Sequence, residues 1–328
     1  MRRFLTLILA FALCVSLLAG CGGNGNNGQT QEENIANSDS NVTDVRATKD
    51  TLTVVLSGEP PTLDPAKGNN NNIGIVNRFV LEALWDSTAD GDYEYWLAEE
   101  TSLEGDTTLH IKLKDDIYFS DGTQLTAEDV LWHYLRTAAD PISTSQFGFI
   151  DPDKSYVVDD LNLVIEFKQA WAPYIPTFAA QRGLIPSKAH FEKVGEAEYA
   201  RGPVGSGPYK VQEWVSGSYI TLVPNEYYHG GEPNFKTITI KFIQESTARV
   251  IEMETGAADV VYDVQASDIS RVEALDGYHI VQGDSYTYYI LCLSMQEPLF
   301  QDINVRKALF YAIDQEALVN SSTDGTAT

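Results

Sequence analysis

Three glycines, at positions 202, 205 and 207, surround a single serine in the stretch GPVGSGPY, and loops of this kind can bind phosphate or carry a nucleophile. A dinucleotide-binding loop needs G-x-G-x-x-G, a P-loop ends in G-K-[ST], and a hydrolase elbow needs G-x-S-x-G. The stretch matches none of these patterns. Pro208 suits the first residue of a strand, and the alternating sequence YKVQEW follows it. The stretch therefore predicts a tight corner that leads into a hairpin.

The residue types that hold metals or catalyse reactions show no diagnostic spacing. The five histidines are scattered, no C-x-x-C occurs, and an EF-hand alignment on Asp86 and Asp90 puts Leu97 where the closing acid must be. We therefore predict no metal, no cofactor and no catalytic residue. The many carboxylates leave a hydrolase open as an alternative, since sequence spacing does not show which of them meet. Aromatic residues such as Trp171 could line a sugar or peptide groove, although core packing is their commoner use.

Charge and composition narrow the possible partners. The formal net charge of −25 argues against a nucleic-acid partner, because phosphate contacts need clustered Lys and Arg. Arg2 and Arg3 precede a short apolar run that ends in LLAGC, which indicates an export signal. Its end resembles the lipobox of bacterial lipoproteins, so the resemblance implies a signal peptide at 1–20 and a lipid on Cys21. Residues 21–49 then form the lipid anchor and a disordered tether.

The remaining chain shows a mixed α/β pattern. Of the other cysteines, Cys14 leaves with the signal, and Cys292 is expected to be a buried, inert thiol. Thr126 and Asp129 predict a capping box at the start of a helix over 127–140, with Val130, Leu131, Tyr134 and Leu135 as its buried stripe. Other helices are expected over 75–84, 246–255 and 304–319. Strands are expected at 52–57, 108–113, 117–120, 156–168 and 209–223 as hairpins, 236–243, 258–264 and 286–294.

Five motifs in series resemble one family. GEPPTLDP, IYFSDGTQLTAEDV, VGSGPYKVQEW, NEYY and DINVRKALFYAID occur in the order and spacing of the extracytoplasmic solute-binding proteins of the peptide and nickel class. The resemblance runs from about residue 50 to the end of the chain. It implies an α/β fold of the type II periplasmic-binding-protein kind, two-lobed, with a subdomain inserted in the first lobe. The first lobe would comprise 50–82 and 191–286, the inserted subdomain 83–190, and the start of the second lobe 287–328.

The resemblance also implies ligand contacts. Asn69, Asn70 and Asn71 follow the LDP motif in the loop that lies at the cleft of peptide-binding members. Phe147 stands where a groove aromatic occurs, and Tyr289 falls on a strand near the hinge between the lobes. The implied grip on an extended peptide is through main-chain hydrogen bonds, which tolerate many side chains.

The function implied is capture of oligopeptides for an ABC importer, by a monomer that is exported, anchored by lipid to the outer face of the cytoplasmic membrane, and works with permease subunits. A nickel complex, a sugar or another solute is the alternative ligand, and a secreted hydrolase or a surface sensor or adhesin is the alternative class. Members of the family continue through a whole second lobe, so we expect a C-terminally truncated chain whose second lobe is largely missing. On this expectation, the 328 residues bind peptides weakly, because ligand is normally enclosed by both lobes.

Overall fold

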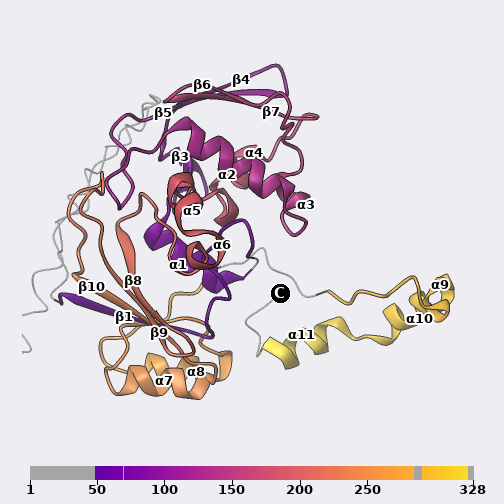
Figure 1. Ribbon diagram of the computed structural model, residues 1–328. Coiled ribbons are helices and arrows are strands. Elements are labelled where there is room, and N and C mark those ends of the chain that lie inside the picture. Colours follow the sequence, from indigo (N-terminus) through magenta and orange to yellow (C-terminus); the bar gives the residue numbers. More distant parts are fainter. Residues whose placement is uncertain (1–48, 69, 284–289, 324–328) are drawn as a thin grey trace, which may run out of the picture. The chain divides into compact units, whose positions relative to one another are not determined.

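The structure is a computed structural model that describes residues 49–68, 70–283 and 290–323 (Figure 1). The strands are β1 Thr51–Leu56, β2 Trp85–Ser87, β3 Tyr93–Tyr95, β4 Ala98–Glu104, β5 Thr108–Leu113, β6 Tyr156–Asp159, β7 Asn162–Glu166, β8 Tyr209–Val215, β9 Tyr219–Pro224, β10 Thr237–Phe242 and β11 Val260–Val261. The helices are α1 Asn71–Val80, α2 Ala127–Ala139, α3 Thr144–Phe147, α4 Tyr174–Ala179, the 3-10 helix η1 Gln181–Gly183, α5 Lys188–Val194, α6 Glu196–Tyr199, α7 Ser246–Glu254, α8 Ala266–Glu273, α9 Pro298–Gln301, α10 Ile303–Ala312 and α11 Gln315–Thr323.

A five-stranded sheet carries the strands that bracket most of the chain, in the order β11-β1-β10-β9-β8. Strand β1 is parallel to both neighbours, β10 and β11, whereas β8 and β9 are antiparallel additions. Helix α7 connects β10 to β11, so the chain crosses β1 between them. The carboxyl ends of β1, β10 and β11 therefore lie at the same edge of the sheet, which is where open α/β sheets bind their ligands.

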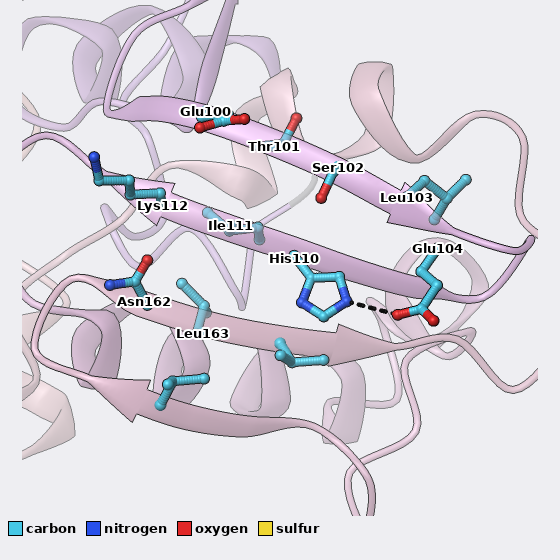
Figure 2. A pocket seen from close by; sticks show the side chains of 12 residues that line it. Glu100, Thr101, Ser102, Leu103, Glu104, His110, Ile111, Lys112, Asn162 and Leu163 are labelled. Atoms are coloured by element: carbon cyan, nitrogen blue, oxygen red, sulfur yellow. Dashed lines mark hydrogen bonds and ion pairs between the residues drawn. The ribbon is translucent and has the colours of Figure 1, made fainter.

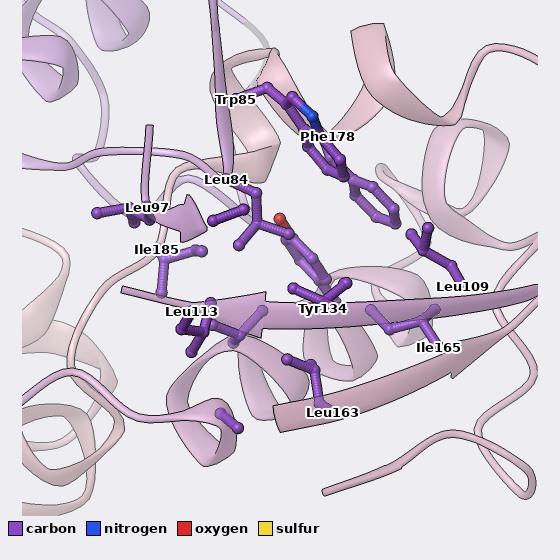
Figure 3. Packing of buried hydrophobic residues seen from close by; sticks show 14 of the residues in the cluster. Leu84, Trp85, Leu97, Leu109, Leu113, Tyr134, Leu163, Ile165, Phe178 and Ile185 are labelled. Carbon is purple, nitrogen blue, oxygen red and sulfur yellow. The ribbon is translucent and has the colours of Figure 1, made fainter. Parts of the chain in front are cut away.

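A second sheet, in the order β4-β5-β7-β6, is antiparallel throughout. Its alternating residues Leu109, Ile111 and Leu113 are buried on one face, whereas His110 and Lys112 between them are not. The buried face packs on an aromatic cluster in which Tyr134 of α2 stacks on Phe178 of α4 with ring centroids 4.5 Å apart (Figure 3). This alternation gives the sheet an apolar inner face and a polar outer face.

The predicted capping box at the start of α2 is confirmed. The Asp129 carboxylate accepts hydrogen bonds from the backbone N–H and the hydroxyl of Thr126, at 3.0 and 2.9 Å. Val130 and Tyr134 are fully buried as predicted, whereas Leu131 and Leu135 are only partly buried. These local bonds satisfy donors that the first turn of a helix otherwise leaves free.

The glycine corner leads into β8 as predicted, and the glycines have a packing role there. Gly207 N–H donates to the carbonyl of Val80 at 3.0 Å, and a Cβ built on Gly205 would lie 2.1 Å from that carbonyl oxygen. Val80 is the last residue of α1. The corner therefore closes on the end of α1, and a side chain at 205 would prevent this approach.

Tertiary contacts changed several predicted elements. The helix expected over 75–84 begins at Asn71 and ends at Val80, because the Val80 carbonyl turns to the glycine corner and Leu81 is extended. The strand expected at 117–120 is only one bridge between Tyr118 and Gln124, since a tight turn closes it at once. The strand expected at 258–264 is reduced to the two residues of β11.

The C-terminal predictions need corrections as well. The single helix expected over 304–319 is two helices, because Ile313 is extended and Asp314 begins the next helix by accepting from the Ala317 N–H at 3.0 Å. Residues 290–294 form no strand, and the rest of the strand expected at 286–294 lies outside the described residues. Cys292 is exposed, not buried, since no sheet surrounds it.

The buried residues form separate clusters for the two larger sheets. The cluster under the antiparallel sheet runs from Leu84 to Ile185, and the cluster under the five-stranded sheet draws on residues 54–83, Leu184 and 209–240. This membership supports an inserted subdomain at 83–190, which stays a prediction. Arg136 of α2 links the two parts, because its guanidinium donates to the buried Asp64 of the LDP motif, at 2.9 Å for Nη1 to Oδ1.

His133, on the inner side of α2, makes stability depend on pH. Its Nε2–H donates to the Arg182 carbonyl at 2.8 Å, its Nδ1 has no partner, and full burial lowers the pKa to about 4 from an ordinary 6.5. Desolvation is the largest cause; Asp64 opposes it and Arg136 adds to it. The unfolded chain binds a proton as the pH falls below 6.5, whereas the folded chain stays neutral until about 4.

We therefore expect stability to fall between pH 6.5 and 4, by about 3 kcal/mol in all at about 1.4 kcal/mol per pH unit. Denaturant unfolding across this window measures the slope. In His133→Gln, which keeps a donor of similar size, this contribution should disappear. An equally steep profile in the variant would show that other groups are responsible.

Candidate functional site

A pocket of about 500 Å³ lies where the carboxyl end of β11 meets the exposed side of α1. It is lined by Asn71, Gly74, Ile75, Arg78, Phe79, Gln181, Tyr262 and Asp263. Strand β1 lies between β10 and β11, and the chain leaves β1 towards α1. The pocket is thus at the edge of the sheet where a parallel α/β fold places ligands, beside a strand whose neighbours connect in different directions.

The asparagines before and within α1 fix its position over the sheet. The Asn70 side chain accepts from the Asn72 N–H at 2.7 Å and so caps the helix. The amide of Asn72 donates to the Gly58 carbonyl at 2.8 Å, and that of Asn77 donates to the Leu63 carbonyl at 3.1 Å. These bonds fasten α1 to the loop after β1, which leaves the exposed Asn71 side chain free to face the pocket.

Arg249 of α7 holds the opposite wall in place. Its side chain is 3 % exposed, and its guanidinium donates to the carbonyls of Ile243 and Gln244 after β10 and of Tyr262 and Asp263 after β11. The donor-to-acceptor distances are 2.6–3.2 Å. One buried side chain therefore ties the ends of two parallel strands together and fixes the backbone that lines the pocket.

Asp263 has the only positive φ, 58°, among non-glycine residues in the part of the chain that the structure describes. A non-glycine residue in this conformation is strained, and such strain concentrates at functional sites. Ser57, directly after β1, donates its hydroxyl to Asp263 Oδ2 at 2.6 Å. The contact orients a carboxylate at the pocket, where it can accept hydrogen bonds from a ligand amine.

Donors gather on the other wall of the pocket. Arg78 pairs with Asp86 at 3.0 Å and donates to the Ala179 carbonyl at 3.1 Å. Gln181 lies against Gly74, where an added Cβ would be 3.3 Å from Gln181 Oε1, and its Nε2 is buried without a hydrogen-bond partner. The pocket thus combines a carboxylate on one side with N–H donors on the other, an arrangement that suits a polar solute.

The residues predicted as ligand contacts have different positions. Asn71 lines the pocket, whereas Asn70 is the helix cap. Phe147 has no exposed surface and packs in the aromatic cluster, 5.7 Å from Tyr134 between ring centroids, so it is a core residue here and not a groove residue. Asn69 and Tyr289 lie outside the described residues, as does Cys21.

Sequence reasoning missed most of the residues that line this pocket. Asp263 follows a predicted strand, and the rule that ligands bind at carboxyl ends of parallel strands was a signal that pointed to it. Arg78 and Gln181 gave no such signal, because their meeting depends on how α1 packs against η1.

Another depression, of about 640 Å³, lies on the outer face of the antiparallel sheet (Figure 2). It is lined by side chains of all four strands, with His110 of β5 pairing with Glu104 of β4 at 3.2 Å. Both side chains of the pair are exposed. The depression belongs to a solvent-facing sheet surface and has no helix end or parallel strand end beside it.

The carboxylate that best fits a hydrolase is a helix cap. Burial raises the pKa of Asp129, and Asp129 and Glu128 line a small depression of about 300 Å³. Both Asp129 oxygens already accept hydrogen bonds, one from Thr126 and the other from the Lys188 N–H at 2.9 Å. Within the described ranges, no three His, Cys, Asp or Glu side chains gather as metal ligands would.

The family is shown by comparison with known proteins. The sequence model of the bacterial extracellular solute-binding proteins, family 5 Middle, matches residues 92–328. The probable D,D-dipeptide-binding periplasmic protein DdpA of Escherichia coli is 26 % identical over 292 residues, which cover 84 % of this chain and 55 % of DdpA. The oligopeptide-binding protein AppA of Bacillus subtilis is 26 % identical over 281 residues, 84 % of this chain and 52 % of AppA.

Solved structures agree. AppA of Bacillus subtilis in complex with a nonapeptide superposes with a TM-score of 0.74 and 26 % identity, over 85 % of this chain and 57 % of that one. NikZ of Campylobacter jejuni in complex with Ni(L-His) gives 0.73 and 21 %, over 84 % and 55 %. The chain thus spans about half the length of the relatives it matches, and no helix among the described residues is long and apolar enough to cross a membrane. The predicted type II periplasmic-binding-protein fold is confirmed, and the chain belongs to the bacterial extracellular solute-binding proteins of family 5.

Proposed function

We propose that this chain captures short peptides outside the cytoplasm and delivers them to the permease of an ABC importer. The observation that carries the proposal is the pocket between α1 and the end of β11, where the Asp263 carboxylate faces a wall that contains Arg78 and Gln181. A peptide carries an amine, a carboxylate and a polar backbone, which match a wall of each charge. Relatives of the family that bind dipeptides, oligopeptides and glutathione support this class of ligand.

A nickel complex is the second candidate. The E. coli nickel-binding periplasmic protein is 27 % identical over 259 residues, and the NikZ structure holds nickel with histidine. The pocket lining contains one carboxylate and no histidine, so a metal would come here with its organic ligand and not as a bare ion. A hydrolase is not proposed, because the solute-binding family gives the pocket a binding role.

Titration with trialanine, followed by amide chemical shifts, tests the peptide proposal. We expect saturable changes with a Kd on the order of 0.1–1 mM, because the described pocket contacts a ligand from one lobe. Ni²⁺ with and without L-histidine is the competing ligand. Saturation by the nickel–histidine complex alone would replace the peptide by a metal complex.

We also propose that the protein is exported and anchored through a lipid on Cys21, on the sequence motif that precedes this residue. We expect mass spectrometry of the membrane fraction to find a mature chain that begins with a modified Cys21. Cys21→Ala should move the protein out of that fraction. An unmodified mature N-terminus at another residue would contradict the anchor.

A further inference from the structure

Two arginine side chains are buried in the described residues, and they differ in how their donors are used. Arg249 is 3 % exposed and donates to four backbone carbonyl oxygens. Arg182 of η1 is 5 % exposed, yet its Nε and Nη2 are buried without a hydrogen-bond partner. A buried cation with free donors costs stability, so it needs a reason to be there.

The surroundings of Arg182 supply no counter-charge within hydrogen-bonding distance. Its Nη1 donates to the side chain of Gln146, a neutral and exposed residue. Asp140 acts on Arg182 only through its charge and is itself paired with Lys67 at 3.0 Å. Burial lowers the pKa of Arg182, with Asp140 opposing it, as expected for a cation whose charge is poorly compensated.

The neighbouring residue shows the same deficit. Gln181 lines the pocket of Asn71 and Arg78, and its Nε2 is also buried without a partner. Consecutive residues of η1 therefore hold unused N–H donors on amide and guanidinium groups, at the wall that already contains the Arg78 cation. Unused donors of this kind fit one chemical class of ligand group, an anion that accepts several hydrogen bonds.

We propose that Gln181 and Arg182 receive the carboxylate of the bound solute at this wall of the pocket. The proposal rests on the proposed function and narrows it to solutes that carry a carboxylate. Because the one side-chain partner of Arg182 is exposed Gln146, turning the guanidinium towards a ligand breaks a single hydrogen bond and leaves Gln146 to water. Arg182 thus trades stability of the unliganded chain for binding.

Arg182→Met removes the unpaired charge and keeps the length of the side chain. We expect its melting temperature in chloride to be about 2–6 °C above that of the unchanged chain, because no buried acceptor loses its donor. The matched control, Arg249→Met, should melt below the unchanged chain, since four carbonyl oxygens lose their partner. A lower melting temperature for Arg182→Met as well would make Arg182 a structural residue and overturn the proposal.

Acetate at matched ionic strength is the probe for the carboxylate. It should raise the melting temperature of the unchanged chain and of Arg249→Met relative to chloride, and leave Arg182→Met unchanged. An equal rise in Arg182→Met would overturn the proposal, because the effect would then belong to the salt.

Trialanine and trialanine amide separate this inference from the proposed function. The acid should bind at least about 10-fold more tightly than the amide, and Arg182→Met should abolish the difference. Equal binding of both would leave the peptide function standing and refute the carboxylate site. If neither peptide binds, the peptide function fails, and the acetate comparison still decides the role of Arg182.

Discussion

Replacing Arg249 with methionine is expected to lower the free energy of unfolding by about 3–5 kcal/mol. The side chain is 3 % exposed and donates to carbonyl oxygens of Ile243, Gln244, Tyr262 and Asp263. Methionine fills a similar volume but donates no hydrogen bond, so these acceptors after β10 and β11 are left without the charged partner. Hydrogen bonds to charged groups contribute more than neutral ones, which makes this loss large for one substitution.

Urea unfolding of the variant and of the unchanged chain measures this difference. Arg271→Met is the control, because Arg271 is exposed and pairs with Glu254 on the surface at 2.7 Å. Surface ion pairs contribute about 0–1 kcal/mol, so the control should be nearly neutral. If Arg249→Met is as neutral as the control, the guanidinium does not hold the two strand ends together.

A methyl group at position 205 is expected to destabilise the protein by about 2–4 kcal/mol, since backbone atoms must move to admit it. The added Cβ of Gly205→Ala would lie 2.1 Å from the Val80 carbonyl oxygen and 2.4 Å from Leu81 Cδ2. These atoms belong to the end of α1, whose exposed side lines the pocket. The substitution should therefore disturb the pocket as well as the stability.

Gly202→Ala, in the same glycine corner, is the matched control. The nearest atom to a Cβ at 202 is Val211 Cβ at 3.9 Å, an ordinary contact. Alanine there should be neutral or stabilise the chain by up to about 1 kcal/mol, because it restricts the unfolded chain. Equal stabilities of the two variants, measured by thermal unfolding, would show that the corner does not need its close approach to α1.

Elements set by neighbouring residues were predictable from the sequence. The capping box of Thr126 and Asp129 acts within one helical turn, and the hairpins of β6–β7 and β8–β9 turn at the predicted residues. The end of α1 was not predictable, because the glycine corner at 205–207 sets it from more than a hundred residues away. The break between α10 and α11 had a local signal in Asp314, which can cap a following helix.

The candidate site was predictable only in part for the same reason. Asn71 follows the LDP motif, so the family resemblance led to it. Gln181 and Asp263 come from segments far apart in the sequence, and their roles depend on the packing of η1 against α1 and on the clamp made by Arg249. Phe147 has the residue type expected of a groove, but the aromatic cluster under the antiparallel sheet takes it up.

The central claim, that solute binds in the pocket between α1 and the end of β11, is tested most directly by mapping trialanine-induced shifts of backbone amides onto the chain. The account predicts saturable shifts at Asn71, Gly74, Tyr262 and Asp263, and their loss in Asn71→Trp, whose indole fills the pocket. Asp153→Trp, at an exposed loop position, should leave them unchanged. Shifts confined to the sheet face around His110 and Lys112, or shifts that persist in Asn71→Trp, would contradict the account.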